Sequence, residues 1–545
     1  MSVVLAGGER RLAAFAPPGV WVAAAALVAI ALAAQLKFGM MADVAWLIDC
    51  DERWLGGAVP YRDFFEINPP ASLLLYLPAV AAARALGIPS EAAVTAFGFL
   101  AAAGAMALSA AILRRAAGPA LLLAAIVAFA ALPGETFCER DHLAALFGVP
   151  FLATALARAE RASVPLPLAL IAGVGAGAMA AIKPPYALIG LLLAAYLWFR
   201  VGRRAVLKAP EYYAAAAMGL AYLACVKPLF PYYIANALPI GVNVYLPARE
   251  SFAALVASPG ALLVLLIAAT AALAAGERAG SPGFVVAALA TLGAAAAYLI
   301  QGKAWVYQAV PAMMFATLAG GFACEAGTRR PLALAAGAAA AALAVSATHS
   351  LGLAFALGLG LSFAVEAGLA RDLTLSAARL GPLALAAAVG AACGVCVIER
   401  PLTPALERAL VALGPNLKIG AVSEDMGLGF PLARRIGATW ALRANSLYVA
   451  SAADHLLADH PGDAALRRRL APYVERERSE LVEDIRTNRP DALLVGPTNT
   501  RLHDEVFADP RLEAAMADYR RTAVEARPGY KAELWVRKDF APAKR

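Results

Sequence analysis

The chain is dominated by a series of apolar runs, each close to the ~20 residues that a helix needs to cross a bilayer. The first extends from Val20 to Leu36, and the others are centred on residues 102, 126, 150, 172, 192, 219, 263, 291, 313, 338, 358 and 389. With 61% hydrophobic and only 16% charged residues, the composition excludes a string of soluble domains. The sequence therefore predicts an α-helical polytopic membrane protein with about 13 transmembrane helices.

Charged residues are concentrated in the last quarter of the chain. Residues 400–545 hold 23 Lys and Arg and 20 Asp and Glu, which is half of all 86 charged residues. Charged helical stretches such as 464–485 alternate there with short apolar stretches at 417–422, 439–442, 492–495 and 532–536. This pattern predicts a transmembrane domain in residues 1–399 and a small soluble α/β domain in residues 400–545, which would act as a lid or dock an acceptor.

One short apolar segment, residues 71–86, decides on which side of the membrane each later loop lies. It contains Pro78 and Arg84, and it is better explained as a helix on the membrane surface within a first outer loop of residues 37–90. The loops on the side of the N-terminus then carry 15 Lys and Arg, against 9 in the loops on the other side. The positive-inside rule therefore predicts a cytoplasmic N-terminus and an extracytoplasmic C-terminal domain, in the plasma membrane or, in a bacterium, the inner membrane.

The same loops explain the formal net charge of +8, so no nucleic-acid partner is implied. With this topology, five polar segments share the outer face, at residues 37–70, 135–142, 182–186, 227–251 and 301–308. The inner loops offer mostly arginine and small residues. The sequence therefore predicts that the chemistry takes place on the outer face.

Asp43 lies where the first span leaves the bilayer. A carboxylate at that depth must be solvated by a cavity or partnered. A general base is one good reason to place it there. An ordinary interfacial acid that helps to end the helix is the alternative.

The first outer loop continues with Leu-Gly-Gly-x-x-Pro-Tyr-Arg-Asp-Phe-x-Glu-x-Asn-Pro-Pro, from Leu55 to Pro70. An acidic residue just after the first span, followed by this motif and a surface helix, resembles the GT-C superfamily of membrane glycosyltransferases. That superfamily includes the protein O-mannosyltransferase and lipid A aminoarabinose transferase types. The resemblance implies a GT-C-like transmembrane catalytic domain that takes a sugar from a polyprenyl phosphate, with Asp43 as the catalytic acid of the first loop.

The second outer loop contains four consecutive polar residues, Glu139, Arg140, Asp141 and His142. GT-C enzymes commonly have an acidic residue in this loop, so Glu139, Arg140, Asp141 and His142 are candidates to bind the donor sugar, the acceptor or a metal. A metal site is weakly indicated, because four adjacent residues at a helix start cannot all face one ion. The alternative is a capped helix terminus in which Asp141 favours the N-terminal dipole.

A lipid phosphate that leaves with negative charge needs cationic partners. Candidates are Arg62, Lys183 and Lys303. Lys183 lies in Ile-Lys-Pro-Pro-Tyr at a predicted helix break, and Lys303 lies in a Gln-Gly-Lys-x-x-x-Tyr run that ends at Tyr307 and resembles GT-C relatives. Snorkelling of either lysine to the headgroups is the alternative.

The chain departs from the aminoarabinose transferase type at Asn68, where those enzymes have a lysine. Glu66 and Asn68 are better suited to recognise sugar hydroxyls than phosphate. Asp49 and Asp51 spell the D-x-D motif of some metal-dependent glycosyltransferases, but residues two apart on a helix point in different directions. No cofactor is predicted, and the support for a divalent metal is weak.

These features predict a hexosyl- or pentosyltransferase with an inverting mechanism. Its donor would be a polyprenyl-phosphate sugar and its acceptor a glycolipid, polysaccharide or protein. The alternative is a transporter or flippase of a lipid-linked glycan, a class that places polar groups and helix breaks near mid-bilayer in repeated halves. A membrane ligase or acyltransferase would need a catalytic His or Ser, and the transmembrane part contains only His142 and His349.

Overall fold

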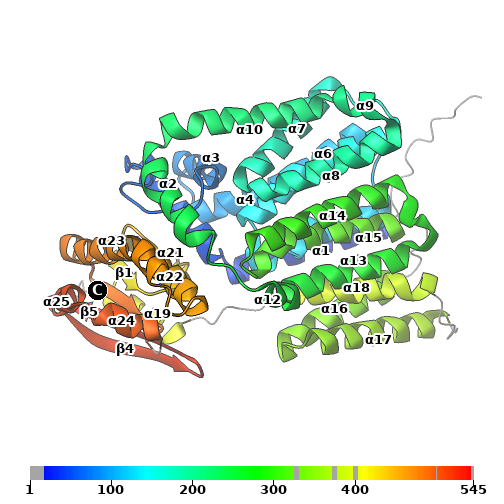
Figure 1. The fold of residues 1–545 in the computed structure, drawn as a ribbon. Coiled ribbons are helices and arrows are strands. Elements are labelled where there is room, and N and C mark those ends of the chain that lie inside the picture. Colours follow the sequence, from blue (N-terminus) through cyan, green and yellow to red (C-terminus); the bar gives the residue numbers. More distant parts are fainter. Residues whose placement is uncertain (1–17, 325–330, 371–376, 397–402, 499, 542–545) are drawn as a thin grey trace, which may run out of the picture.

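A bundle of long helices and a smaller part built around a β-sheet make up the molecule (Figure 1). The structure is a computed structural model that describes residues 18–324, 331–370, 377–396, 403–498 and 500–541. The predicted domain boundary at residues 399 and 400 lies outside these ranges. The division into two domains at that boundary remains a prediction.

Each predicted apolar run coincides with one helix of the bundle. These helices are α1 (Pro18–Phe38), α4 (Ser90–Leu113), α5 (Pro119–Ile126), α6 (Arg140–Ala159), α7 (Leu166–Ile182), α8 (Ala187–Val201), α10 (Pro210–Leu229), α13 (Pro259–Ala275), α14 (Pro282–Gln301), α15 (Val306–Cys324), α16 (Pro331–Thr348), α17 (Leu351–Ala370) and α18 (Ala377–Val395). The prediction of an α-helical polytopic membrane protein is confirmed.

The helices of the bundle differ in whether they are long enough to cross a membrane. Among the described residues, 7 helices are long and apolar enough to cross a membrane. Helix α10 and the following segment, Tyr233–Tyr245, are bent by 90° against each other and together make an eighth candidate. The remaining predicted runs are shorter apolar helices, so the count of thirteen remains a prediction.

Helices α6 and α15 form the centre of the bundle. In each of them 89% of the apolar stretch is buried, whereas only 17% is buried in α1 and 22% in α4. The outer helices expose large apolar side chains such as Leu100 and Phe199. A helix that is apolar on all sides and exposes such residues suits a lipid environment.

Short elements connect the long helices at their ends. They are α2 (Ala42–Leu55), α3 (Ala71–Leu86), η1 (Val127–Ala131), η2 (Gly134–Thr136), η3 (Pro184–Tyr186), α9 (Arg203–Leu207), η4 (Tyr233–Ala237), α11 (Leu238–Ile240), η5 (Gly241–Tyr245), α12 (Phe252–Ala257) and η6 (Gly276–Gly280). Helix α3 is the predicted surface helix. It packs against α2 and α4 next to the C-terminal part (Figure 1).

The C-terminal part contains a five-stranded sheet of order β2-β1-β3-β5-β4. Its strands are β1 (Lys418–Val422), β2 (Thr439–Trp440), β3 (Ala492–Val495), β4 (Tyr519–Arg527) and β5 (Tyr530–Arg537). Strand β1 runs parallel to β2 and β3, and β5 runs antiparallel to β3 and β4. The surrounding helices are α19 (Pro404–Leu413), α20 (Met426–Gly429), α21 (Leu432–Arg435), α22 (Tyr448–Asp459), α23 (Ala464–Asn488), α24 (Arg501–Phe507) and α25 (Pro510–Met516). The predicted α/β domain is confirmed, with one strand, β4, that the apolar pattern did not indicate.

Contacts with the first outer loop hold this C-terminal part against the bundle. The Arg434 guanidinium lies 2.8 Å from a carboxylate oxygen of Glu52 on α2, and it also pairs with Glu91 at the start of α4. Arg53 on α2 donates hydrogen bonds to the backbone carbonyls of Trp440 and Leu442. The C-terminal part therefore lies directly over the loop that contains Asp43.

Candidate functional site

The five polar segments that were predicted to share one face meet at the end of the bundle nearest the C-terminal part. Arg140 from the second segment lies 3.4 Å from Asp43 of the first. Lys183 from the third donates to Gln301 of the fifth, at 2.9 Å. Lys303 donates to the backbone carbonyl of Tyr245 in the fourth, at 2.6 Å. Side chains from distant parts of the sequence therefore form one polar cluster.

Asp43 occupies the first turn of α2, which begins four residues after α1 ends. Its side chain is 19% exposed, and one carboxylate oxygen faces the buried guanidinium of Arg140. A helix N-terminus and a neighbouring cation both stabilise a negative charge at this position. Asp43 is therefore a partly accessible carboxylate at the edge of the cluster.

The start of α6 supplies three buried charged residues, Glu139, Arg140 and Asp141. Glu139 is the N-cap, and its carboxylate accepts a hydrogen bond of 2.6 Å from the backbone N–H of Asp141. The other oxygen of Glu139 lies 3.1 Å from Nε of Arg140. The helix-cap interpretation is correct for Glu139, and the same carboxylate also orients Arg140 toward Asp43.

Lys183 connects three elements of the bundle. It ends α7 in an extended conformation, as expected for a residue that precedes proline. Its Nζ lies 2.5 Å from Asp141 and 5.3 Å from the centre of the Tyr307 ring. The Tyr186 hydroxyl donates to the second oxygen of the same aspartate. Asp141 therefore already has two protein partners, and Lys183 is positioned by a carboxylate, an amide and an aromatic ring.

Lys303 fixes the segment that follows η5. Its ammonium group donates to the backbone carbonyls of Tyr245 and Ala248 and lies 4.3 Å from the centre of the Tyr245 ring. Burial lowers the pKa of Lys303 to about 8. Two of its three N–H donors hold the backbone, which leaves one for another partner.

Glu66 and Asn68 hold the first loop against α2. The Glu66 carboxylate accepts hydrogen bonds from Nε1 of Trp46 at 2.9 Å, from the backbone N–H of Asn68 at 2.8 Å and from the Asn68 side-chain amide at 2.5 Å. Only 4% of Glu66 is exposed, and burial raises its pKa. Glu66 therefore positions the loop beside Asp43, and its oxygens are largely occupied by the protein.

Two predicted residues are not part of the cluster. Arg62 is half exposed and pairs with its neighbour Asp63 at 2.8 Å. His142 is buried; its Nδ1 accepts from the backbone N–H of Cys138 at 3.1 Å, and its Nε2 lies 2.9 Å from the carbonyl of Phe129. This pairing requires the proton on Nε2, so both ring nitrogens are occupied by the backbone.

Some buried donors have no protein partner, which the sequence did not predict. Within the described residues these include Nη1 of Arg140 and Nε2 of Gln301. Buried polar groups are normally hydrogen-bonded, so an open donor beside charged residues indicates a place for a ligand or water. Arg140 lies inside the acidic motif of the second loop, but nothing in the sequence distinguished it from its neighbours.

The D-x-D spelling does not bring two carboxylates together. Helix α2 is regular through both residues, so Asp49 pairs with Arg53 at 2.7 Å while Asp51 is fully buried. Burial raises the pKa of Asp51 to about 9. Among the described residues, no group of three or more His, Cys, Asp or Glu side chains is arranged to hold a metal ion.

Comparison with known proteins finds a similarity to solved structures. No family model and no curated protein matches the chain. The crystal structure of ArnT from Cupriavidus metallidurans bound to undecaprenyl phosphate is similar, with a TM-score of 0.55 and 15% identity over 97% of this chain and 100% of that chain. The apo state of the same protein gives a TM-score of 0.57 and 17% identity over 96% and 99%. The chain therefore has the same fold as ArnT.

Proposed function

We propose that this protein is a membrane glycosyltransferase that uses a polyprenyl-phosphate-linked sugar as donor. The observation that carries the proposal is the polar cluster at one end of the bundle, where the Asp43 carboxylate faces the buried guanidinium of Arg140. The similar fold of ArnT, which was crystallised with undecaprenyl phosphate, supports the class of donor. The acceptor is a glycolipid, a polysaccharide or a protein.

Asp43 is the general base of the proposed reaction. It removes the proton from an acceptor hydroxyl while the hydroxyl oxygen attacks the anomeric carbon of the donor. The bond between that carbon and the phosphate oxygen breaks, and its electron pair leaves with the polyprenyl phosphate. Attack opposite the leaving group inverts the anomeric configuration.

Arg140, Lys183 and Lys303 stabilise the leaving phosphate. Nη1 of Arg140 is buried without a partner, and Lys183 pairs with Asp141, the next residue on α6. Donors that are already oriented before the reaction stabilise developing charge without further reorganisation. Tyr307 and Asn68 border the same cluster and contact the sugar. Arg62 has no role in this mechanism.

A transfer assay tests the proposed function. Purified full-length protein is incubated with a defined panel of polyprenyl-phosphate sugars and candidate acceptors, and release of polyprenyl phosphate is measured. The configuration of the product by NMR distinguishes inversion from retention. Movement of intact lipid-linked glycan across a vesicle membrane without cleavage would instead establish the transporter alternative.

The proposed active site lies on the extracytoplasmic side. Helices α4 and α8 start at the end of the bundle that carries the cluster, so Arg114 and Arg203, which follow them, lie at the opposite end. Cysteine-accessibility labelling at Ala58, Arg203 and Ala464 tests the orientation. We expect positions 58 and 464 to react from outside and position 203 from the cytoplasm; labelling of position 464 only from the cytoplasm would reverse the assignment.

A further inference from the structure

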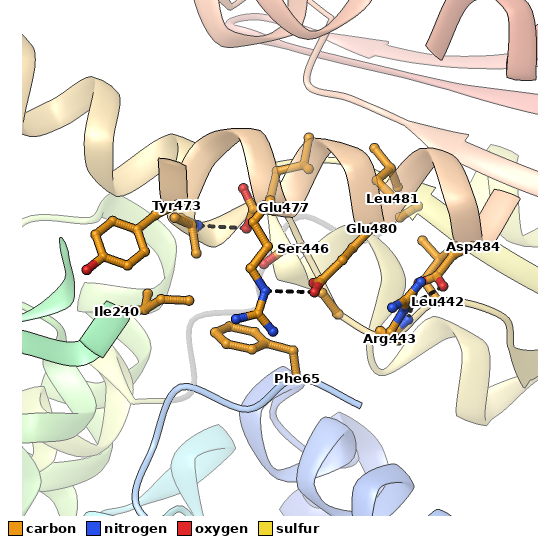
Figure 2. Close-up of a pocket in the computed structure, with 15 residues that line it drawn as sticks. Phe65, Ile240, Leu442, Arg443, Ser446, Tyr473, Glu477, Glu480, Leu481 and Asp484 are labelled. Atoms are coloured by element: carbon orange, nitrogen blue, oxygen red, sulfur yellow. Dashed lines mark hydrogen bonds and ion pairs between the residues drawn. The ribbon is translucent and has the colours of Figure 1, made fainter. Parts of the chain in front are cut away.

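A pocket lies between the C-terminal part, the first outer loop and the segment after α10. It contains about 520 Å³ of empty space, part of which is open to solvent. Phe65 from the first loop and Ile240 from α11 form one side, and Tyr473, Glu477 and Glu480 of α23 form the other (Figure 2). Residues from both parts of the molecule therefore line the pocket.

Short chain segments and hydrogen bonds connect the pocket to the polar cluster. Phe65 precedes Glu66, which is bonded to Trp46 one helical turn after Asp43. On the other side, Asn243 of η5 donates to the hydroxyl of Tyr473 in the pocket. Tyr245, two residues further along, is held by Lys303. The same segments therefore supply residues to the pocket and to the cluster.

The charged groups of the pocket are paired with one another. Arg476 lies 2.8 Å from Glu480, and Arg443 lies 2.8 Å from Asp484. Glu477 accepts hydrogen bonds of 2.8 Å from two backbone N–H groups at the start of α22. A phosphate or another anion needs an excess of cationic donors, and the lining holds two arginines against three carboxyls.

Paired carboxylates and guanidiniums still have free lone pairs and N–H groups for a neutral ligand. Phe65 and Tyr473 add aromatic surface on which an apolar face can pack. Many hydroxyls combined with apolar ring faces are the chemistry of a saccharide. Resting on the proposed transfer reaction, we propose that this pocket binds the acceptor as an uncharged saccharide chain whose end reaches Asp43.

Direct binding to the full-length protein in nanodiscs tests this proposal without any donor. The probes are fluorescently labelled hexasaccharides of mannose, galactose and arabinose, with hexagalacturonate and a neutral hexapeptide for comparison. We expect at least one neutral hexasaccharide to bind more tightly than hexagalacturonate or the peptide. Binding of none of the neutral probes, or tighter binding of either comparison probe, would overturn the proposal.

Substitutions assign the binding to this pocket. Glu480→Gln keeps the shape of the side chain and Phe65→Ala removes the ring; each should weaken saccharide binding about tenfold or more. Glu505→Gln is the matched control, since Glu505 forms the same i,i+4 ion pair with Arg501, also at 2.8 Å, away from the pocket. Unchanged binding in both Glu480→Gln and Phe65→Ala would show that the saccharide binds elsewhere.

The melting temperature identifies any variant that fails to fold, and Glu480→Gln then carries the test. Saccharide binding that depends on the pocket, in a protein that releases no polyprenyl phosphate, would refute the proposed reaction and leave the pocket as a saccharide site. Donor cleavage without saccharide binding would do the reverse.

Discussion

The two ends of the helical bundle both bury charged residues, but they satisfy them differently. At the end away from the C-terminal part, Arg158 forms two hydrogen bonds of 3.1 Å with the buried carboxylate of Glu211. At the other end, Arg140 shares two carboxylates at 3.1 and 3.4 Å and keeps one buried nitrogen without a partner. The two arginines lie on the same helix, 18 residues and therefore about 27 Å apart.

This difference distinguishes a structural pair from a binding site. A forked pair that uses both carboxylate oxygens joins α6 to α10 and leaves little for a ligand. The cluster around Arg140, in contrast, keeps buried donors without a protein partner, among them Nη1 of Arg140. If this comparison is correct, substitutions at the two ends should separate turnover from stability.

Asp43→Asn is expected to have the largest effect on turnover. The amide nearly preserves the shape of the side chain and cannot accept the acceptor proton, so turnover should fall by about 10²–10⁴-fold. Donor binding and the melting temperature should change little. Sugar-transfer kinetics together with lipid-phosphate binding measure both quantities.

Substitutions in the second outer loop test whether another residue is the base. Near-normal turnover in Asp43→Asn, combined with loss of turnover in Glu139→Gln or Asp141→Asn, would move the base to the start of α6. The positions of the open donors would then need a different explanation.

Arg158→Ala tests the structural end. It leaves the Glu211 carboxylate buried without its partner, which should destabilise the fold by about 3–5 kcal/mol. Turnover per folded molecule should stay close to that of the wild type, because the site is at the other end of the helix. Thermal unfolding measures the loss of stability, and active-site titration measures turnover per folded molecule. A loss of turnover without a loss of stability would contradict a purely structural role of Arg158.

Lys183→Ala should weaken binding of a polyprenyl phosphate by about 1.5–3 kcal/mol, the range for hydrogen bonds to charged groups. Lys303→Ala should do the same. The double variant Lys183→Ala with Asp141→Asn removes both charges of the ion pair, so no buried carboxylate is left without its partner. Weaker phosphate binding in this variant would then come from the missing lysine and not from an unpaired Asp141. Exposed Lys208 at the opposite end is the control, and equal binding in all variants would leave both lysines with a structural role alone.

The smallest expected effect is a pH dependence through Lys303. Because burial lowers its pKa to about 8, the ammonium form is present below that pH and is lost above it. Phosphate binding should therefore weaken gradually as the pH rises from 7 to 9. Lys303→Arg should remove this dependence, since arginine stays charged over the whole range. A pH profile that is identical in both proteins would exclude Lys303 as a phosphate contact.

The bundle could be located from the sequence because apolar length determines where membrane helices form. Even the segment 71–86 was predicted as a helix. The sequence did not reveal which helices are central, because α6 and α1 are both apolar and only packing distinguishes them. Strand β4 was missed because Tyr519–Arg527 is an edge strand with mostly exposed polar side chains.

The candidate site was predicted as a set of segments rather than as a set of contacts. Polar residues at helix ends indicated Asp43, Glu139, Asp141 and Lys183 as members of one group, and the structure brings these four together around Arg140 and α6. The use of each side chain depends on partners distant in sequence, which no spacing rule provides. His142 is adjacent to Asp141, yet the backbone around Phe129 and Cys138 occupies its ring nitrogens.

Arg434 has a consequence for how substrates arrive. Its guanidinium binds Glu52 beside the first loop and Glu91 on a helix of the bundle, so one side chain sets the orientation of the C-terminal domain relative to both. Swinging that domain away would break both ion pairs and the two carbonyl contacts of Arg53 in one movement. These contacts favour the observed orientation of the C-terminal part. In the proposed reaction the lipid donor enters sideways from the bilayer and the acceptor from the water, along separate routes that meet at Asp43.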